Sequence, residues 1–406
     1  METLVVVGAS LAGLSAARAA RAQGFAGPLI LIGDEPHRPY DRPPLSKDFL
    51  LGTITTEDLF LETDDDGLQA KWILGVGAVG LDAETRTIHL ADGQSVTADR
   101  IVIATGARCR QIPALKGLDN VFNLRTISDA QGLALKLVAG DRIIIIGAGF
   151  IGAEVASAAA SRGMDVTMIN NNAVPFTAQL GPDMGATVAK LHISKGVELI
   201  SGAAIEEFDT TDREVTGLLL ADGRRLPANV VVVGIGAVPN IEWLEGSGVN
   251  LCDGVLCDSM GRTNVPGIVA VGDCAAWFEG GLGRHRRVEH WTGALERAAL
   301  AVQALLDHDA SQQPLKPPYF WSDQHGVKIQ FAGHSAGYDR LEIEAGDPQD
   351  HNFLAIYYQG EIPVAVLGMN QPRLFTKWRR SIGNPAARPA PTRLVSAAAS
   401  IATPIS

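Results

Sequence analysis

A glycine-rich pattern between two apolar stretches occurs twice in this chain, and it limits the fold more than any other feature. The first copy, TLVVVGASLAGLSAARAARAQGFAGPLILIGDE, covers residues 3–35. An apolar run turns at GASLAG, continues with apolar residues at helical spacing, and is followed by a second apolar run, which is the pattern of a strand–helix–strand unit. We therefore predict that this segment forms a dinucleotide-binding fold.

Each position of the first turn has a physical reason. Gly8 permits a tight turn, Gly13 lets the helix pack closely on the strand, and the backbone N–H groups at the helix N-terminus face a pyrophosphate. Ser10 replaces the middle glycine, a mild departure because serine is small and can donate to a phosphate. Asp34 and Glu35 end the second strand about 20 residues later, where a ribose hydroxyl would bind. A purely structural strand–helix turn is the alternative.

The second copy, DRIIIIGAGFIGAEVASAAASRGMDVTMINN, begins at residue 141 and has the full glycine pattern, with Gly147, Gly149 and Gly152. Two such folds in one chain suggest a flavin enzyme that binds FAD in one fold and a nicotinamide in the other, so that hydride donor and acceptor meet. The strand of this copy ends at Asn170, where such a fold usually has an acid.

Three further apolar runs end in residues suited to a cofactor site. RIVIATGA (100–107) contains Ala104, Thr105 and Gly106, and VVVVGIGAVPN (230–240) contains Gly236, all suited to close backbone approach. GIVAVGDCA (267–275) ends in Asp273, whose carboxylate could bind the polyol linker of FAD. Taken alone, an acid at a strand end is more often a cap or turn residue.

Composition sets the remaining limits. The 406 residues, 46% hydrophobic and 19% charged, suit two or three domains with substantial cores. Neither an apolar run of about 18 residues nor a signal-type start occurs, so we expect a cytoplasmic protein without a membrane span. The net charge of −11 argues against nucleic-acid binding. We expect no metal site, and the C-x4-C spacing of Cys252 and Cys257 reads as a turn, which makes thiol–disulfide chemistry the weaker mechanism.

Longer motifs give a resemblance that runs from about residue 3 to about residue 382. They are RPYDRPPLSKDFL (38–50), LRTISDA (124–130), RVEHWTGALERA (287–298) and YFWSDQHGVKIQFAG (319–333). With them the chain resembles the FAD-dependent, nicotinamide-linked ferredoxin reductases of bacterial oxygenase systems, the group of putidaredoxin reductase and biphenyl dioxygenase ferredoxin reductase. The glycine motifs mark only a superfamily, whereas RPPLSK together with FWSDQ is narrow.

The resemblance implies an α/β fold with two Rossmann-like dinucleotide-binding domains, as in glutathione reductase, and a small C-terminal α+β domain. The FAD-binding domain would comprise residues 1–112 and 241–315, and the NAD(P)-binding domain residues 113–240. Residues 316–385 would form the C-terminal domain, because short strands and turns follow ASQQPLKPP. Residues 386–406, rich in Ala, Pro and Ser, would be a flexible tail.

Site residues follow from the matched motifs. Those that would contact FAD are Ala12, Asp34, Arg42, Lys47, Val79, Arg125, Asp273 and Trp291. Lys47 would stabilise negative charge on the reduced ring, and Trp291 would lie beside it. A surface ion pair for Lys47 and a core position for Trp291 are the alternatives.

On the nicotinamide side, Phe150, Ile151 and Glu154 follow the glycine turn, and similar enzymes use the matching acid near the nicotinamide ring. Stabilisation of the Glu154 charge by the helix macrodipole is a competing or additional explanation. Asn170 keeps a hydrogen-bonding amide but loses the charge that would repel a 2′-phosphate. NADH should therefore remain usable, with NADPH less excluded than in similar enzymes.

The predicted reaction is hydride transfer from NAD(P)H to FAD, followed by two single-electron transfers to a [2Fe–2S] ferredoxin that serves a P450 or Rieske-type oxygenase. Two basic clusters, RHRR and KWRR, could bind an acidic ferredoxin, although a solvated surface is the alternative. Their candidate contacts are Arg284, Arg286, Arg287, Arg379 and Arg380. An oxidase or small-acceptor reductase, and a redox switch like apoptosis-inducing factor, are the rival functions. The oligomeric state stays open.

Overall fold

The first parallel sheet contains the first glycine turn. A computed structural model describes residues 1–62, 66–307, 310 and 316–384. The sheet has the strand order β20-β7-β1-β2-β3. Its strands are β1 (Leu4–Val7), β2 (Leu29–Gly33), β3 (Ala70–Leu74), β7 (Arg100–Ile103) and β20 (Ile268–Ala270). The apolar residues of β1, β7 and β20 are buried, as expected for a sheet covered on both faces, whereas the edge strand β3 is partly exposed.

The second parallel sheet repeats this design around the second glycine turn, with the order β12-β11-β10-β16-β9. Its strands are β9 (Val121–Phe122), β10 (Arg142–Ile146), β11 (Asp165–Asn170), β12 (Glu198–Ser201) and β16 (Val230–Val233). The helices of this part are α3 (Ile127–Lys136), α4 (Phe150–Ser161) and α5 (Thr177–Ser194). The central strand β10 pairs in parallel with β11 and β16, so its carboxyl end opens toward the glycine turn.

Smaller elements complete the two nucleotide folds. The FAD-side helices are α1 (Leu11–Ala22), α2 (Asp48–Leu51) and α6 (Trp291–Leu306). The other strands of this part of the chain are β4 (Ala78–Asp82), β5 (Thr87–Leu90), β6 (Ser95–Thr97), β8 (Ala107–Cys109), β13 (Ile205–Thr211), β14 (Glu214–Leu220), β15 (Arg225–Pro227), β17 (Ala237–Pro239), β18 (Leu251–Cys252), β19 (Gly254–Cys257), β21 (Ala275–Glu279) and β22 (Arg284–Arg287). The 3-10 helices of the chain are η1 (Pro43–Ser46), η2 (Glu57–Leu59), η4 (Pro113–Leu115), η5 (Glu242–Leu244), η6 (Gly272–Cys274) and η7 (Pro348–Asp350).

The two crossings between the nucleotide folds lie side by side. β8 leaves the first fold and β17 returns from the second, and they pair as an antiparallel ribbon. A proline follows β8 at Pro113 and another ends β17 at Pro239. The domain bounds themselves stay a prediction.

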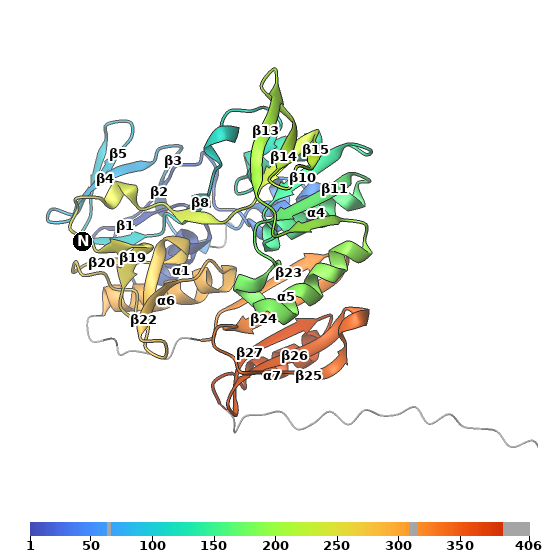
Figure 1. Cartoon of the computed structure of the whole chain (residues 1–406). Helices are drawn as coiled ribbons and strands as arrows, with labels where there is room; N and C mark the ends of the chain where they lie inside the picture. Colours follow the sequence, from blue (N-terminus) through green and yellow to red (C-terminus); the bar gives the residue numbers. More distant parts are fainter. Residues whose placement is uncertain (63–65, 308–309, 311–315, 385–406) are drawn as a thin grey trace, which may run out of the picture.

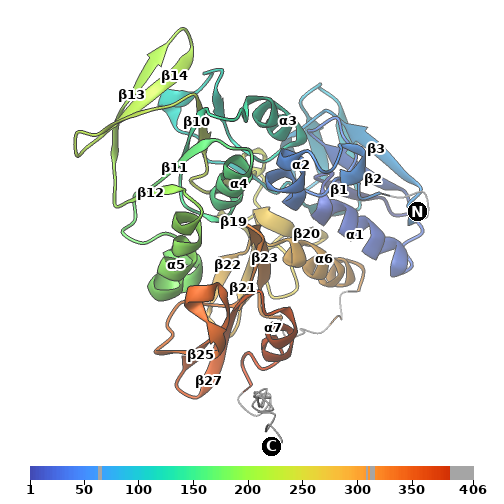
Figure 2. The ribbon, with the colours of Figure 1, turned by 90° about the vertical axis from the view of Figure 1, so that its right-hand side faces the viewer.

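The C-terminal part is an antiparallel sheet with one helix. The sheet has the order β23-β24-β27-β26-β25. Its elements are β23 (Tyr319–Gln324), β24 (Val327–Gly333), β25 (Arg340–Asp347), β26 (Asn352–Gln359), β27 (Ile362–Met369) and α7 (Pro372–Arg379). Figure 1 places it at the lower right, with the first parallel sheet on the left and the second at the upper right. Figure 2 shows it below both nucleotide folds.

The predicted fold class is confirmed: two parallel sheets with helices are followed by a small α+β unit. The predicted tail, residues 386–406, lies outside the described residues. Among the described helices, none combines the length and apolar character that crossing a bilayer requires.

Candidate functional site

A cavity of about 1040 Å³ is lined by both glycine turns and by the first strand of the C-terminal sheet. Predicted site residues that line it are Ser10, Ala12, Arg42, Lys47, Ala104, Gly106, Arg125, Gly147, Gly149, Phe150, Ile151, Gly152, Glu154, Asn170, Gly236, Asp273 and Trp291. The structure therefore brings together residues from segments that are far apart in the sequence.

The first glycine turn is shaped by tight backbone packing. Gly8 has φ of +121°, and a Cβ there would lie 2.0 Å from the carbonyl oxygen of Ala104. A Cβ on Gly13 would lie 1.9 Å from the carbonyl oxygen of Gly8. The turn therefore depends on both glycines for its geometry, whereas Ser10 and Ala12 present the surface that lines the cavity.

In the second turn, one glycine is required by backbone packing and another borders open space. Gly147 has φ of +107°, and a Cβ there would lie 2.3 Å from the carbonyl oxygen of Gly234. Gly149 has an ordinary φ of −92°, and a Cβ there would meet no atom of the described chain within 4 Å. Since neither conformation nor packing requires a glycine at this position, its absent side chain leaves room for a close ligand at the N-terminus of α4.

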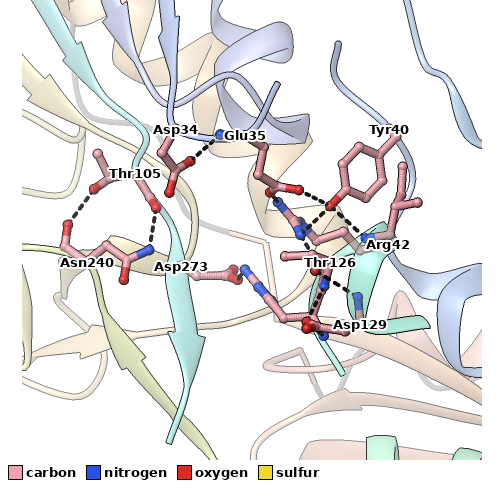
Figure 3. A network of polar contacts seen from close by, with 11 residues as sticks. Asp34, Glu35, Tyr40, Arg42, Thr105, Thr126, Asp129, Asn240 and Asp273 are labelled. Atoms are coloured by element: carbon pink, nitrogen blue, oxygen red, sulfur yellow. Dashed lines mark hydrogen bonds and ion pairs between the residues drawn. The ribbon is translucent and has the colours of Figure 1, made fainter. Parts of the chain in front are cut away.

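A polar network surrounds the acids at the end of β2 (Figure 3). Glu35 forms an ion pair with Arg42 at 2.6 Å and accepts a hydrogen bond of 2.6 Å from the Tyr40 hydroxyl. Asp34 is exposed, and its carboxylate accepts from the backbone N–H of Glu35 at 3.0 Å. Glu35 thus orients Arg42, which lines the cavity, while neither acid lines it directly.

The remaining predicted residues outside the lining are Gly8, Gly13, Val79 and Thr105. Val79 lies on β4 and is 57% exposed. The Thr105 hydroxyl donates to the Asn240 carbonyl at 2.6 Å, next to the crossing ribbon. Their contacts with a cofactor stay a prediction.

Positive charge gathers in the part of the cavity formed by the first nucleotide fold. The cationic lining residues are Arg42, Lys47, Arg125, Arg286 and Arg287. Arg125 donates to Asp273 in an ion pair of 2.8 Å. Half-buried cations of this kind, together with the N-terminus of α1, suit a pyrophosphate.

Lys47 and Glu154 meet where the two nucleotide folds adjoin. Glu154 is 3% exposed, and its Oε2 lies 2.9 Å from the Lys47 ammonium. It also accepts hydrogen bonds from the hydroxyls of Ser46 and Ser322. Burial raises the pKa of Glu154, while Lys47 and the two hydroxyls oppose that rise. The carboxylate is therefore held by direct partners, and Lys47 is a buried ion pair rather than a surface one.

Sequence reasoning missed both serines of this cluster. Ser46 directly precedes Lys47 in RPPLSK, and Ser322 is the serine of FWSDQ, so the two narrow motifs supply one hydroxyl each. Their shared partner, Glu154, lies 108 and 168 residues away in the sequence. The two motifs contain both serines, but only the fold shows that the two hydroxyls meet at Glu154.

Trp291 lies at the start of α6 and lines the cavity. Its indole N–H donates to the Asp41 carboxylate at 2.7 Å, and burial raises the pKa of Asp41. The ring meets Trp321 edge to face, with centroids 5.6 Å apart. Trp291 is thus a fixed wall of the site rather than a residue of the hydrophobic core.

His290 has a buried polar atom that a bound ligand could contact. Its Nδ1 is buried and has no hydrogen-bond partner among the described residues, although the side chain lines the cavity. Burial lowers the pKa of His290 to about 4, so the ring is neutral at pH 7. A buried polar atom without a partner is costly, and a polar ligand such as FAD or a nicotinamide nucleotide in this cavity could supply one.

The first basic cluster is divided by the structure. Arg287 is 11% exposed and pairs with Asp253 at 3.3 Å and with Glu289. Arg286 faces Glu279 at 3.9 Å, whereas Arg284 is exposed. Of these three predicted partner contacts, Arg286 and Arg287 therefore line the cavity and form ion pairs.

The second basic cluster lies at the end of α7. Arg380 is exposed, and the Arg379 guanidinium stacks over the Tyr319 ring at 4.3 Å. Tyr319 in turn stacks on Trp321, with ring centroids 6.1 Å apart. An aromatic series therefore connects the cavity to this basic surface.

The asparagines at the end of β11 line the part of the cavity that the second nucleotide fold forms. Asn170 is 7% exposed, and its amide donates to the Asn172 carbonyl at 2.9 Å. Among the lining residues numbered 146–237, Glu154 is the one charged side chain. The described lining thus offers neither an acid at the strand end nor a cation for a 2′-phosphate.

The cysteines give no sign of a redox pair. Cys109 is the one described cysteine that lines the cavity, and burial raises its pKa. Cys252 and Cys257 lie on paired strands on either side of the Asp253 turn and are free, which confirms the predicted turn.

Comparisons with known proteins agree with this geometry. The family model described as pyridine nucleotide-disulphide oxidoreductase matches residues 2–298. The model described as reductase C-terminal matches residues 319–403. The second match begins at Tyr319, the first residue of β23.

Similar proteins are reductases of oxygenase systems. Putidaredoxin reductase of Pseudomonas putida is 34% identical over 94% of this chain and 92% of its own length. The ferredoxin–NAD(+) reductase component of the biphenyl dioxygenase system of Paraburkholderia xenovorans is 32% identical over 94% and 93%. A crystal structure of the covalent putidaredoxin reductase–putidaredoxin complex matches with a TM-score of 0.89 and 34% identity, covering 93% of this chain and 92% of that chain. The predicted resemblance is confirmed.

Proposed function

Since this chain belongs to the pyridine nucleotide-disulphide oxidoreductase family, we propose that it is an FAD-dependent reductase that passes electrons from NAD(P)H to a [2Fe–2S] ferredoxin of a P450 or Rieske-type oxygenase. The observation that carries this proposal is the cavity that both glycine turns line. Two nucleotides bound to the two turns would direct their reactive ends toward the Lys47–Glu154 pair. The balanced reaction converts NADH and two oxidised ferredoxins into NAD⁺, a proton and two reduced ferredoxins.

FAD would bind to the first fold. The residues that would hold it are Ser10, Ala12, Arg42, Lys47, Arg125, Asp273 and Trp291. When bound, a flavin accepts a hydride from a reduced nicotinamide and gives up the two electrons singly. Lys47 would supply a positive charge to the flavin site, and Trp291 would form part of its wall.

The nicotinamide nucleotide would bind to the second fold, with its pyrophosphate at the N-terminus of α4 beside Gly149. Glu154 would face the nicotinamide ring. With Asn170 at the strand end, NADH is usable and NADPH is not repelled, although no lining cation of this fold attracts its extra phosphate. Selectivity between the two is therefore relaxed.

A protein acceptor would dock at the end of α7. The aromatic series Trp291–Trp321–Tyr319 leads from the cavity to Arg379. Arg379 and Arg380 place positive charge at its outer end, which suits an acidic ferredoxin. The chain carries a net charge of −11, so this surface is a local exception that can orient the partner.

The test uses the holoenzyme, NADH and an acidic [2Fe–2S] ferredoxin. We expect cytochrome c reduction to depend on added ferredoxin. Replacing Arg379 and Arg380 together by Glu should lower the ferredoxin reduction rate roughly 10-fold at low salt and flatten its salt dependence, because electrostatic attraction is screened by salt. Ferricyanide reduction should not change, since it needs no docking surface.

The matched control replaces Arg224 and Arg225 by Glu. These adjacent exposed arginines change the net charge equally, and Figure 1 shows β15 at the end of the molecule opposite to α7. An equal loss in both double variants would place the dock elsewhere. Fast oxygen consumption without any need for ferredoxin would instead identify an oxidase.

A further inference from the structure

A row of hydrogen-bonded side chains lies behind Glu154, between α4, α5 and the β23–β24 hairpin. Ser322 donates to Glu154, and its Oγ lies 2.9 Å from the Gln324 amide nitrogen. The Gln324 carbonyl oxygen lies 2.8 Å from His192 Nε2. His192 Nδ1 lies 3.1 Å from His325 Nε2. Ser322, Gln324 and His192 are at most 1% exposed, so the row is sealed from solvent up to His325.

The placement of the Gln324 amide, with its nitrogen toward Ser322 and its oxygen toward His192, gives the bonds of this row one direction. A carboxylate only accepts, so the single proton of the Ser322 hydroxyl points to Glu154 and its oxygen accepts from the Gln324 NH₂ group. The Gln324 carbonyl then faces His192, whose Nε2 must carry the ring proton. His192 Nδ1 is thus left as an acceptor for His325. All donors point toward Glu154.

The row is mismatched with a proton on Glu154 Oε1. Such a proton would point at Ser322, whose oxygen already accepts from the Gln324 NH₂ group, so the Ser322 proton would have no acceptor in the row. The row therefore favours the carboxylate over the carboxylic acid. Since the Gln324 amide does not readily carry a proton onward, the row holds Glu154 rather than conducting protons.

The hairpin that supplies half of the row is fixed to the helix that carries Glu154. His325 and Gly326 form its two-residue turn, both with positive φ. The backbone N–H of His325 donates to the Ser157 hydroxyl of α4 at 2.7 Å. This bond holds the turn of the hairpin and lies outside the row that ends at Glu154.

We propose that Ser322, Gln324 and His192 are positioning residues that keep the Glu154 carboxylate ionised and directed toward the nicotinamide site. This inference rests on the proposed function, because it takes Glu154 to face the nicotinamide. The three residues act through Glu154 and do not line the cavity themselves.

The charged and titratable groups around the row agree with it. Lys47 contacts Glu154 from η1 and α2, on the oxygen that Ser322 leaves free. Burial lowers the pKa of His192, and burial with His192 and Lys195 lowers the pKa of His325 to about 4. Both rings are thus neutral at pH 7, as the row requires.

The first readout is the ionisation of Glu154 itself. In holoenzyme labelled with ¹³C at the glutamate carboxyls, the Glu154 signal is assigned by its loss in Glu154→Gln. In Ser322→Ala we expect the titration midpoint to rise by roughly 1 pH unit, because a hydrogen bond to the charged form is lost. The matched control Ser157→Ala removes a hydrogen bond to the same hairpin outside the row and should leave the midpoint unchanged. Equal midpoints in both variants overturn the proposal.

A second pair of variants keeps the test decisive if Ser322→Ala does not fold. His192→Leu removes the donor to Gln324, and His192→Gln keeps an N–H at that place. We expect a smaller upward shift of the midpoint in His192→Leu and a value near the wild type in His192→Gln. Identical shifts in the two variants would mean that only packing matters, which contradicts a positioning role.

The second readout is flavin reduction by NADH in single turnover as a function of pH. The acid limb should move with the Glu154 midpoint in Ser322→Ala and stay in place in Ser157→Ala. A shifted midpoint with an unchanged rate profile overturns the positioning role. A wild-type flavin that NADH does not reduce contradicts the proposed function instead, and the carboxyl titration still decides whether the row keeps Glu154 ionised.

Discussion

The two nucleotide folds share a backbone design but differ in the charge that they present to one cavity. The first fold and its neighbours contribute five cations to the lining. From residue 146 to residue 237, the second fold contributes one charged lining residue, the buried Glu154. Both turns nevertheless place a helix N-terminus beside the cavity, after Ser10 and Gly149.

This difference separates a site that retains its ligand from one that exchanges it. Charge-assisted hydrogen bonds are roughly twice as strong as neutral ones, and they add to the backbone N–H groups in the first fold. The second fold has to rely mainly on N–H groups and on apolar contact. A bound flavin that stays through many cycles, and a nicotinamide that leaves in each cycle, match these two designs.

The largest expected effect is on stability, at the glycine of the second turn that has no room for a Cβ. Gly147→Ala places a Cβ 2.3 Å from the Gly234 carbonyl oxygen at a φ of +107°, so we expect a loss of about 3 kcal/mol or more in unfolding free energy. Thermal or denaturant unfolding of the holoenzyme measures it.

Gly149→Ala is the matched variant two residues away. Its Cβ meets no atom of the described chain, so the unfolding free energy should be nearly unchanged while the dissociation constant for NADH rises. Unchanged NADH binding in a folded Gly149→Ala protein would show that this turn does not approach the nucleotide.

The next prediction concerns the cations of the cavity lining. Arg125→Met removes the partner of Asp273 and one charge from the lining. We expect the FAD dissociation constant to rise roughly 10- to 100-fold, the range for one or two charge-assisted hydrogen bonds. Flavin fluorescence during equilibrium dialysis measures the constant.

Arg108→Met provides the control for this prediction. Arg108 pairs with Glu242 at the crossing ribbon, and both side chains are about half exposed. An exposed pair contributes about 1 kcal/mol or less, so FAD affinity should stay within a few-fold. An equal loss in both variants would attribute the effect to the ribbon and not to charge in the cavity.

The glycine turns could be read from the sequence because part of their constraint is local. A Cβ on Gly13 would lie 1.9 Å from the carbonyl oxygen of Gly8, and one on Gly152 would lie 2.5 Å from that of Gly147, both within one strand–helix–strand unit. The two parallel sheets and the antiparallel C-terminal sheet were predictable for the same reason, since apolar periodicity reports on each segment separately.

The polar cluster could not be read in this way. Ser46, Glu154 and Ser322 come from three distant segments, and their meeting depends on how the C-terminal sheet packs on the nucleotide folds. The basic cluster at residues 284–287 is divided for a related reason: Arg286 and Arg287 line the cavity and form ion pairs, whereas Arg284 is exposed. A run of like charges in a sequence does not reveal which of its members the fold turns inward.

The smallest expected effect tests whether the end of β11 decides the choice of nucleotide. In Asn170→Glu, a carboxylate at the strand end should bind the ribose diol and repel a 2′-phosphate, which raises the NADH over NADPH preference roughly 10-fold. Single-turnover flavin reduction with both nucleotides measures the preference. Asn171→Glu adds the same charge to an exposed neighbour in the lining and should change the preference less, because it lies past the strand end. Equal preferences in the wild type and Asn170→Glu would mean that Asn170 only closes the turn through its bond to Asn172. The choice between NADH and NADPH would then depend on other residues of the second fold.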